Sequence, residues 1–127
     1  MIVVDTSALI AVSAREPEAA ACEAALVAND LLISAATLAE ALIVAKRKNA
    51  EESLQALIDG LGLEVVEVSE DFAVLVAEIY GRWGKGFHPA RLNYGDCFSY
   101  ALAEMYACPL LYIGDDFTQT DVRRALG

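Results

Sequence analysis

The stretch from Asn93 to Phe117, NYGDCFSYALAEMYACPLLYIGDDF, joins an apolar helix-like segment to a short apolar run that ends abruptly at two acids. Apolar side chains at helical spacing predict a helix over 95–107. The run Leu110–Ile113 is short and wholly apolar, which is typical of a strand buried on both faces. The stretch therefore predicts a helix followed by a buried strand.

The same alternation extends through the rest of the chain. Short apolar runs predict further strands over 2–4, 31–33 and 63–68. Capping residues and helical spacing predict helices over 6–14, 17–28, 34–48, 51–58 and 69–83, and a last short helix from Thr118 or Thr120 to Gly127. Short buried strands that alternate with helices indicate an α/β sandwich around a mostly parallel sheet. No repeat or linker interrupts the chain, so we expect one domain over residues 1–127.

Composition indicates a globular protein with no membrane segment. The chain has 127 residues, of which 57% are hydrophobic and 22% are charged. No charge-free apolar run approaches the roughly 18 residues that a membrane span needs. The N-terminus reaches Asp5 at once, without the basic start and long apolar stretch of a signal peptide. We therefore expect a cytoplasmic protein that does not bind membranes.

Three cysteines, Cys22, Cys97 and Cys108, are an odd number without CxxC or Cys/His spacing. This pattern argues against a disulfide framework and against a zinc site. We expect reduced thiols that fill the core.

The formal net charge of −10 limits the possible partners. Such a surface repels free RNA or DNA unless basic groups cluster locally or divalent cations intervene. It attracts a basic protein or peptide. Any nuclease hypothesis has to account for this charge.

Acidic residues fall at the ends of the segments that are predicted to be buried. Asp5 directly follows the first strand, and Asp115 and Asp116 follow the last. Asp96 lies in the first turn of the helix before that last strand, and Glu40 lies within an apolar helix. Each has a simpler explanation, as a helix cap, a dipole partner, a turn residue or a solvated side chain. Because the carboxyl ends of parallel strands meet at one edge of a sheet, however, all of these acids could converge there.

Carboxylates gathered in one crevice repel one another unless a cation lies between them. Clusters of oxygen ligands suit Mg²⁺ or Mn²⁺. A metal-activated water could then attack a phosphoryl group, and the ion would supply the positive potential that the protein lacks. We find no convincing Ser-His-Asp or Cys-His arrangement, and the single histidine, His88, lies in a Gly/Pro-rich loop.

Four motifs carry a family resemblance. They are Ile2–Ile10 (IVVDTSALI), Ser34–Glu40 (SAATLAE), Leu92–Ala103 (LNYGDCFSYALA) and Leu110–Phe117 (LLYIGDDF) with Thr120-Asp121. In this order and spacing they resemble the PIN-domain ribonucleases, and more closely the toxin half of VapBC-type toxin–antitoxin pairs. The match spans the chain from end to end.

The resemblance implies a PIN-like three-layer sandwich and a Mg²⁺- or Mn²⁺-dependent endoribonuclease. Such an enzyme cleaves structured RNA, commonly tRNA or rRNA, and leaves 5′-phosphate and 3′-hydroxyl ends. The resemblance implies Asp5, Glu40 and Asp96 as the acidic, metal-binding centre, with Asp116 favoured over Asp115 as the fourth acid. It also implies that Ser7, or less so Thr6, orients ligands or water near Asp5.

The resemblance also implies two protein partners. The family's toxins usually form homodimers, and a cognate VapB-type antitoxin silences them by placing its tail, which often presents arginine, in the active-site groove. An acidic groove on a protein of charge −10 suits such a tail.

Two basic segments could contact RNA. In the Gly-rich segment 81–91, Arg82, Lys85 and Arg91 could meet phosphates while Trp83 stacks on bases. The alternative is a connection whose aromatic residues fill the core. In the second segment, 46–48, three consecutive basic residues are more simply explained as cations that stabilise a helix C-terminus.

Two other functions fit part of the pattern. Phosphatases of the HAD type also begin with a strand that ends in Asp and carry a late Gly-Asp-Asp, here Gly114–Asp116. Their first motif needs an acid two residues after the nucleophile, however, and that position is Ser7. A non-enzymatic protein that binds a metal or an antitoxin is the other alternative.

Overall fold

The computed structural model describes residues 1–126 and contains a four-stranded sheet with the strand order β3-β2-β1-β4. Every neighbouring pair of strands is parallel. The strands are β1 (Ile2–Val4), β2 (Leu31–Ser34), β3 (Leu63–Val66) and β4 (Leu110–Leu111). The helices are α1 (Thr6–Ser13), α2 (Ala19–Ala28), α3 (Ala35–Arg47), α4 (Glu51–Gly60), α5 (Glu70–Trp83) and α6 (Tyr94–Tyr106). The predicted α/β fold with a parallel sheet is confirmed.

β1, β2 and β4 are buried because helices cover both faces of the sheet, whereas the edge strand β3 exposes Glu64 and Val65 and is not the buried strand that the sequence predicted. In β1, Ile2 and Val4 point into one hydrophobic cluster while Val3 points into the other. In β2, Leu31 and Ile33 likewise point into the first cluster, and Leu32 points into the second. Alternate residues of a strand face opposite sides of a sheet, so a strand buried on both sides needs an unbroken apolar run.

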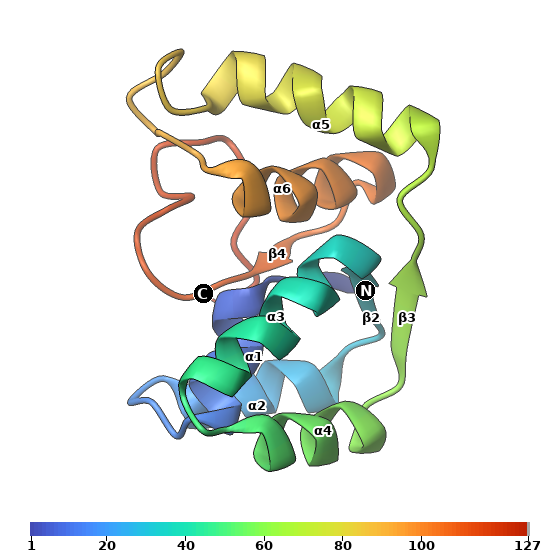
Figure 1. Cartoon of the computed structure of the whole chain (residues 1–127), viewed down its shortest axis with the longest axis vertical. Helices are drawn as coiled ribbons and strands as arrows, with labels where there is room; N and C mark the ends of the chain where they lie inside the picture. Colours follow the sequence, from blue (N-terminus) through green and yellow to red (C-terminus); the bar gives the residue numbers. More distant parts are fainter. Residues whose placement is uncertain (127) are drawn as a thin grey trace.

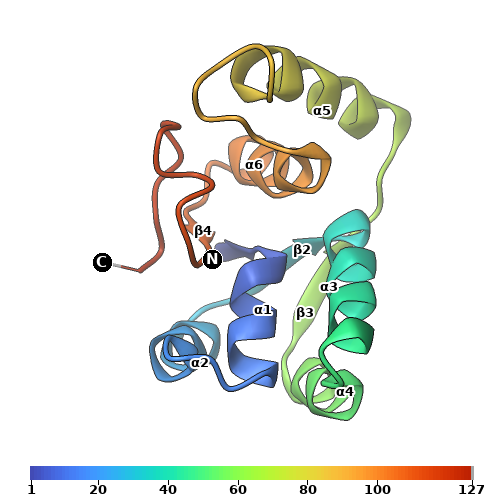
Figure 2. The same cartoon turned by 60° about the vertical axis from the view of Figure 1, so that its left-hand side comes forward.

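The helices form two layers around the sheet (Figure 1). α5 and α6 lie together on one face, while α1, α2 and α4 lie on the other (Figure 2). α3 packs against α1, α4 and α6. The result is the three-layer sandwich that the sequence predicted.

Side-chain caps fix where several helices begin. The Ser34 hydroxyl accepts a hydrogen bond from the backbone N–H of Thr37 at 3.1 Å, and Ser69 caps α5 in the same way through Phe72. Asp5 is the N-cap of α1, in agreement with its simpler explanation as a helix cap. These contacts satisfy backbone N–H groups that the first turn of a helix leaves without a partner.

The strand order places the end of β1 beside the end of β4. From β1 the chain proceeds outward through β2 to β3, and then crosses to β4 on the other side of β1. Such a reversal opens a crevice between the carboxyl ends of β1 and β4. The segments that follow β1 and β4 therefore meet at this point.

The helix predicted from Thr118 or Thr120 to Gly127 is wrong over the described residues, and Gly127 itself lies outside them. The segment instead forms turns and then pairs with β4 through a bridge between Leu110 and Arg124. The Leu110 N–H donates to the Arg123 carbonyl at 2.8 Å, and the Leu110 carbonyl accepts from Ala125 at 2.9 Å. The Arg123 carbonyl and the Ala125 N–H are thus satisfied by the edge of the sheet, while the Thr118 and Thr120 N–H groups donate within turns.

Smaller differences concern strand lengths and one thiol. The strands predicted over 63–68 and 110–113 end at Val66 and Leu111. Cys22 and Cys97 are buried free thiols as expected, but Cys108 is only partly buried and does not belong to the core proper. Among residues 1–126, no helix is long and apolar enough to cross a membrane.

Candidate acidic active site

A cleft of about 300 Å³ opens at the carboxyl ends of β1 and β4. Four of the acids singled out in the sequence line it, namely Asp5, Glu40, Asp96 and Asp116. The remaining lining residues are Thr6, Ser7, Ile10, Glu16, Val44, Lys48, Asn93 and Ile113. Asp115 is not among the residues that line the cleft.

Asp5 is held by hydroxyl groups on both of its carboxylate oxygens. Oδ2 accepts from the Ser7 hydroxyl at 2.6 Å and from the Ser7 backbone N–H at 3.1 Å. Oδ1 accepts from the Ser99 hydroxyl at 2.5 Å. The Ser7 oxygen in turn accepts from the Ile113 N–H at 3.0 Å, so the chain just beyond β4 is tied to the start of α1. Asp5 is therefore both a helix cap and a fixed, buried carboxylate in the cleft.

Glu40 reaches the cleft from the middle of α3. Its Oε1 accepts from the Thr6 hydroxyl at 2.6 Å. Its carboxylate lies directly over Gly95, where a β-carbon would come within 2.9 Å of the Glu40 Cδ. The absence of a side chain at Gly95 thus lets Glu40 approach the first turn of α6, next to Asp96. The alternative in which Glu40 points to solvent is not what the structure shows.

Asp96 closes the first turn of α6 through a capping box with Asn93. Its Oδ2 accepts from the Asn93 N–H at 3.0 Å, and the Asn93 side chain accepts from the Asp96 N–H at 2.8 Å. Burial raises the pKa of Asp96 from 3.8 to about 7, and the negative charges of Asp116, Asp5 and Glu40 add to this rise against the lowering effect of the Asn93 N–H. Burial, with a smaller contribution from the neighbouring acids, therefore favours the protonated form of Asp96.

Asp116 is placed by the turn that follows β4. Gly114 has a φ of +92°, a conformation that residues with side chains rarely adopt. Phe117 then packs against Tyr112 in the core, with ring centroids 5.0 Å apart. Asp116 lies between these two anchors and lines the cleft, whereas the Asp115 carbonyl accepts hydrogen bonds from Thr118.

The four carboxylates of the cleft are chemically suited to bind a hard cation. All of the candidate ligands are carboxylate oxygens, which Mg²⁺ and Mn²⁺ prefer, and a cation would relieve their repulsion. Among residues 1–126, however, no three acidic, histidine or cysteine side chains are already arranged as a group that could hold a metal ion. The cleft thus gathers the acids without presenting a finished coordination sphere.

The residues proposed to bind RNA lie outside this cleft. Arg82 pairs with Glu104 at 3.0 Å, and Trp83 packs partly buried against His88 and Tyr100. Lys85 and Arg91 line neighbouring surface hollows. The larger of these, an apolar groove of about 620 Å³ between α5 and α6, shares Asn93 with the acidic cleft. Contact between these residues and RNA remains a prediction.

Sequence reasoning missed the hydroxyl that completes the support of Asp5. Ser99 lies three residues after Asp96, a spacing that places both side chains on one face of a helix. That spacing was a signal available in the sequence. Lys48 lies eight residues after Glu40 on the same stripe of α3, which was a similar signal, whereas Glu16 had none because it lies on another segment of the chain.

Comparison with known proteins identifies the family. The model of the PIN domain family matches residues 2–123. VapC ribonuclease Mb0640 of Mycobacterium bovis is 40% identical over 125 residues, with 95% of each chain covered. Ribonuclease VapC42 of Mycobacterium tuberculosis is 40% identical over a 129-position alignment that covers 98% of each chain.

Solved structures share the fold at lower sequence identity. The crystal structure of VapC20 of Mycobacterium tuberculosis, described as a sarcin-ricin loop cleaving toxin, matches with a TM-score of 0.78 and 19% identity over 96% of each chain. A toxin–antitoxin complex from Klebsiella pneumoniae matches with a TM-score of 0.71 and 20% identity, over 95% of this chain and 93% of that one. Family model, relatives and fold agree with the four sequence motifs, and the chain belongs to the PIN domain family, among its VapC-type ribonucleases.

Proposed function

We propose that this protein is a Mg²⁺- or Mn²⁺-dependent endoribonuclease whose centre is formed by Asp5, Glu40, Asp96 and Asp116. One observation carries the proposal: carboxylates from four separate segments line a single cleft at the point where the strand order reverses. The relatives that are 40% identical along nearly the whole chain are named ribonucleases, which supports the reaction class.

The protein's own residues would hold the acids in place for an ion. Ser7 and Ser99 fix both oxygens of Asp5, and Thr6 fixes one oxygen of Glu40. Oδ2 of Asp96 is held by Asn93. When bound, the metal would make a coordinated water a better nucleophile and neutralise charge on the phosphodiester. No protein nucleophile is needed.

The electrostatics of the chain are consistent with this dependence on a cation. RNA approaching a protein of net charge −10 meets repulsion, which is strongest at a cleft lined by carboxylates. A divalent ion would offset part of the negative charge, and only inside the cleft. A phosphate of the substrate would then meet less repulsion at the site of cleavage, where it can contact the ion, than at the surface at large.

We also propose a structured RNA such as tRNA or rRNA as substrate, a cognate VapB-type antitoxin as partner, a homodimeric state and a cytoplasmic location. The VapC names of the relatives and the acidity of the cleft, which suits a basic antitoxin tail, support the partner. Membership of the PIN family leaves the HAD-type phosphatase without support. The following test distinguishes this enzyme from a protein that binds metal and antitoxin without catalysis.

Asp96→Asn and Asp116→Asn should each lower RNA cleavage by at least about 100-fold, because each removes a negatively charged metal ligand. Asp115→Asn is the matched control, since its side chain does not line the cleft, and it should cleave like the wild type. The measurement is the cleavage rate of total tRNA and rRNA by antitoxin-free protein with Mn²⁺, and with EDTA as a second control. Wild-type rates in Asp96→Asn would contradict the proposed centre. Metal binding without cleavage by the wild type would indicate the binding-only alternative.

Gly95→Ala should weaken Mn²⁺ binding by about 10-fold or more while the protein stays folded. The new methyl group collides with the Glu40 carboxylate, which is the far end of a flexible side chain and can move away from the cleft. Gly81→Ala is the control, because that helical position has open space around it and alanine there should only stabilise α5. Calorimetric titration with Mn²⁺ measures the affinities, and equal affinities in both variants would show that Glu40 does not help to hold the ion.

Metal binding should strengthen as the pH rises to about 7. The pKa of Asp96 is raised to about 7 in the folded protein, so below that pH a cation has to displace a proton. For the same reason the metal-free protein should lose stability as the pH rises from about 4 to about 7, because the folded state binds this proton more tightly than the unfolded state does. Calorimetry and chemical unfolding across this range measure both effects. Stability that depends on pH equally in wild type and Asp96→Asn would contradict this assignment.

A further inference from the structure

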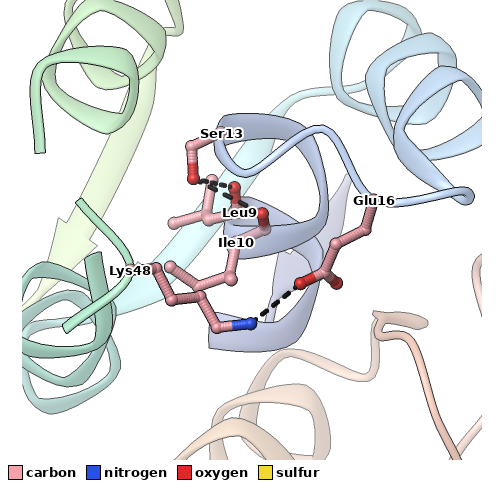
Figure 3. Close-up of polar contacts among 5 residues, drawn as sticks. All are labelled: Leu9, Ile10, Ser13, Glu16 and Lys48. Atoms are coloured by element: carbon pink, nitrogen blue, oxygen red, sulfur yellow. Dashed lines mark hydrogen bonds and ion pairs between the residues drawn. The ribbon is translucent and has the colours of Figure 1, made fainter. Parts of the chain in front are cut away.

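An ion pair spans the wall of the acidic cleft away from the four carboxylates. Lys48 Nζ lies 3.0 Å from Glu16 Oε2, and both residues line the cleft. Figure 3 shows the two side chains pointing toward one another from different segments, Glu16 from the chain after α1 and Lys48 from the end of α3. Lys48 is the single basic residue among those that line the cleft in the described part of the chain.

Both partners are positioned by well-defined helix ends. After α1, Arg15 adopts a φ of 54°, and the Glu16 N–H donates to the Ala11 carbonyl at 2.8 Å. After α3, Asn49 adopts a φ of 53°, and the Ala50 N–H donates to the Ala45 carbonyl at 2.9 Å. These are the left-handed closures that commonly terminate helices. The backbone at each partner is therefore fixed, while the side chains remain free to exchange contacts.

Lys48 and Glu40 lie at opposite ends of a stripe of α3 that faces the cleft. Glu40, Val44 and Lys48 follow one another at four-residue spacing on one stripe of the helix. With a rise of about 1.5 Å per residue, Lys48 lies roughly 12 Å along the axis from Glu40. This separation suits a phosphate at Lys48 that neighbours, along the strand, the one held at the carboxylates.

We propose that Lys48 binds a flanking phosphate of the RNA substrate and that Glu16 holds it in the absence of RNA. This inference rests on the proposed ribonuclease function and identifies how the substrate strand is positioned. Both side chains are partly exposed, at 46% for Lys48 and 31% for Glu16, and ion pairs with such exposure contribute little to stability. Lys48 can therefore leave Glu16 for a phosphate at little cost. Glu16 competes with the phosphate for Lys48 and repels the strand.

A purely structural ion pair predicts something different. If the contact only joined α1 to α3, removing either partner would have the same effect on stability and on RNA binding. If Lys48 binds phosphate, removing Lys48 weakens RNA binding, and removing Glu16 strengthens it. The two substitutions thus act in opposite directions on KM.

The chain provides a matched control. Lys46 lies in the last turn of the same helix and forms an ion pair of the same length, 3.0 Å, with Glu51. Neither Lys46 nor Glu51 lines the cleft. Lys46→Gln therefore removes the same charge from the same helix end without affecting the cleft.

The test compares wild type, Lys48→Gln, Lys48→Arg, Glu16→Gln and Lys46→Gln in the Mn²⁺-dependent cleavage of labelled total tRNA at several NaCl concentrations. Lys48→Gln should raise KM about fivefold, with kcat little changed. It should also make the slope of log(kcat/KM) against log[NaCl] shallower by about 1, which corresponds to the loss of one phosphate contact. Lys48→Arg should retain the wild-type KM, and Glu16→Gln should lower KM about twofold. Lys46→Gln should match the wild type. Thermal unfolding of each variant accompanies the kinetics.

Two results would overturn the assignment. In one, Lys48→Gln has the KM and salt dependence of Lys46→Gln. In the other, Glu16→Gln and Lys48→Gln change KM in the same direction and lower the unfolding temperature together. A wild type that shows no metal-dependent cleavage contradicts the ribonuclease proposal itself, and the inference about Lys48 with it. That failure is visible before any variant is compared.

Discussion

Mutual repulsion among carboxylates is the constraint around which this molecule is organised. Asp5, Glu40, Asp96 and Asp116 come from four segments and line one cleft, and part of their repulsion is seen in the raised pKa of Asp96. The surrounding structure holds these carboxylates close together despite their repulsion. The parallel sheet brings the ends of β1 and β4 together, and hydrogen bonds from Ser7, Ser99, Thr6 and Asn93 orient the acids. In the proposed function, a bound cation would offset the negative charge that these carboxylates bring together.

The same residues serve the fold and the site. Asp5 caps α1 and Asp96 closes the capping box of α6, so the simple structural explanations are correct at these positions, while the proposed roles in metal binding remain predictions for the same two residues. Gly95 and Gly114 are needed for space and for a left-handed turn, respectively, and each places an acid. Substitutions at the acids will therefore affect both stability and chemistry, and metal affinity separates the two effects better than activity does.

Most of the fold could be predicted from local patterns. Strands such as 2–4 and 31–33 are unbroken apolar runs because both faces of the sheet are covered. Ser34 and Ser69 mark the starts of α3 and α5. The acids of the cleft could be named because they follow strands or lie in apolar helices, and the relatives confirm the family to which their motifs belong. The last helix was wrongly predicted, since the pairing of Arg124 with Leu110 depends on the position of β4 in the folded sheet. The contact between Glu16 and Lys48 depends on the angle between two helices, which no local pattern encodes.

Anomalous diffraction from crystals grown with Mn²⁺ would show whether the four carboxylates share a divalent cation. We expect one or two manganese peaks inside the cleft, with oxygens of Asp5 and Asp96 at the roughly 2.0–2.2 Å expected for such ligands and Asp116 or Glu40 completing the set. Manganese bound only at other acidic positions, or carboxylates in the cleft that remain without metal at saturating Mn²⁺, would rule out a shared cation.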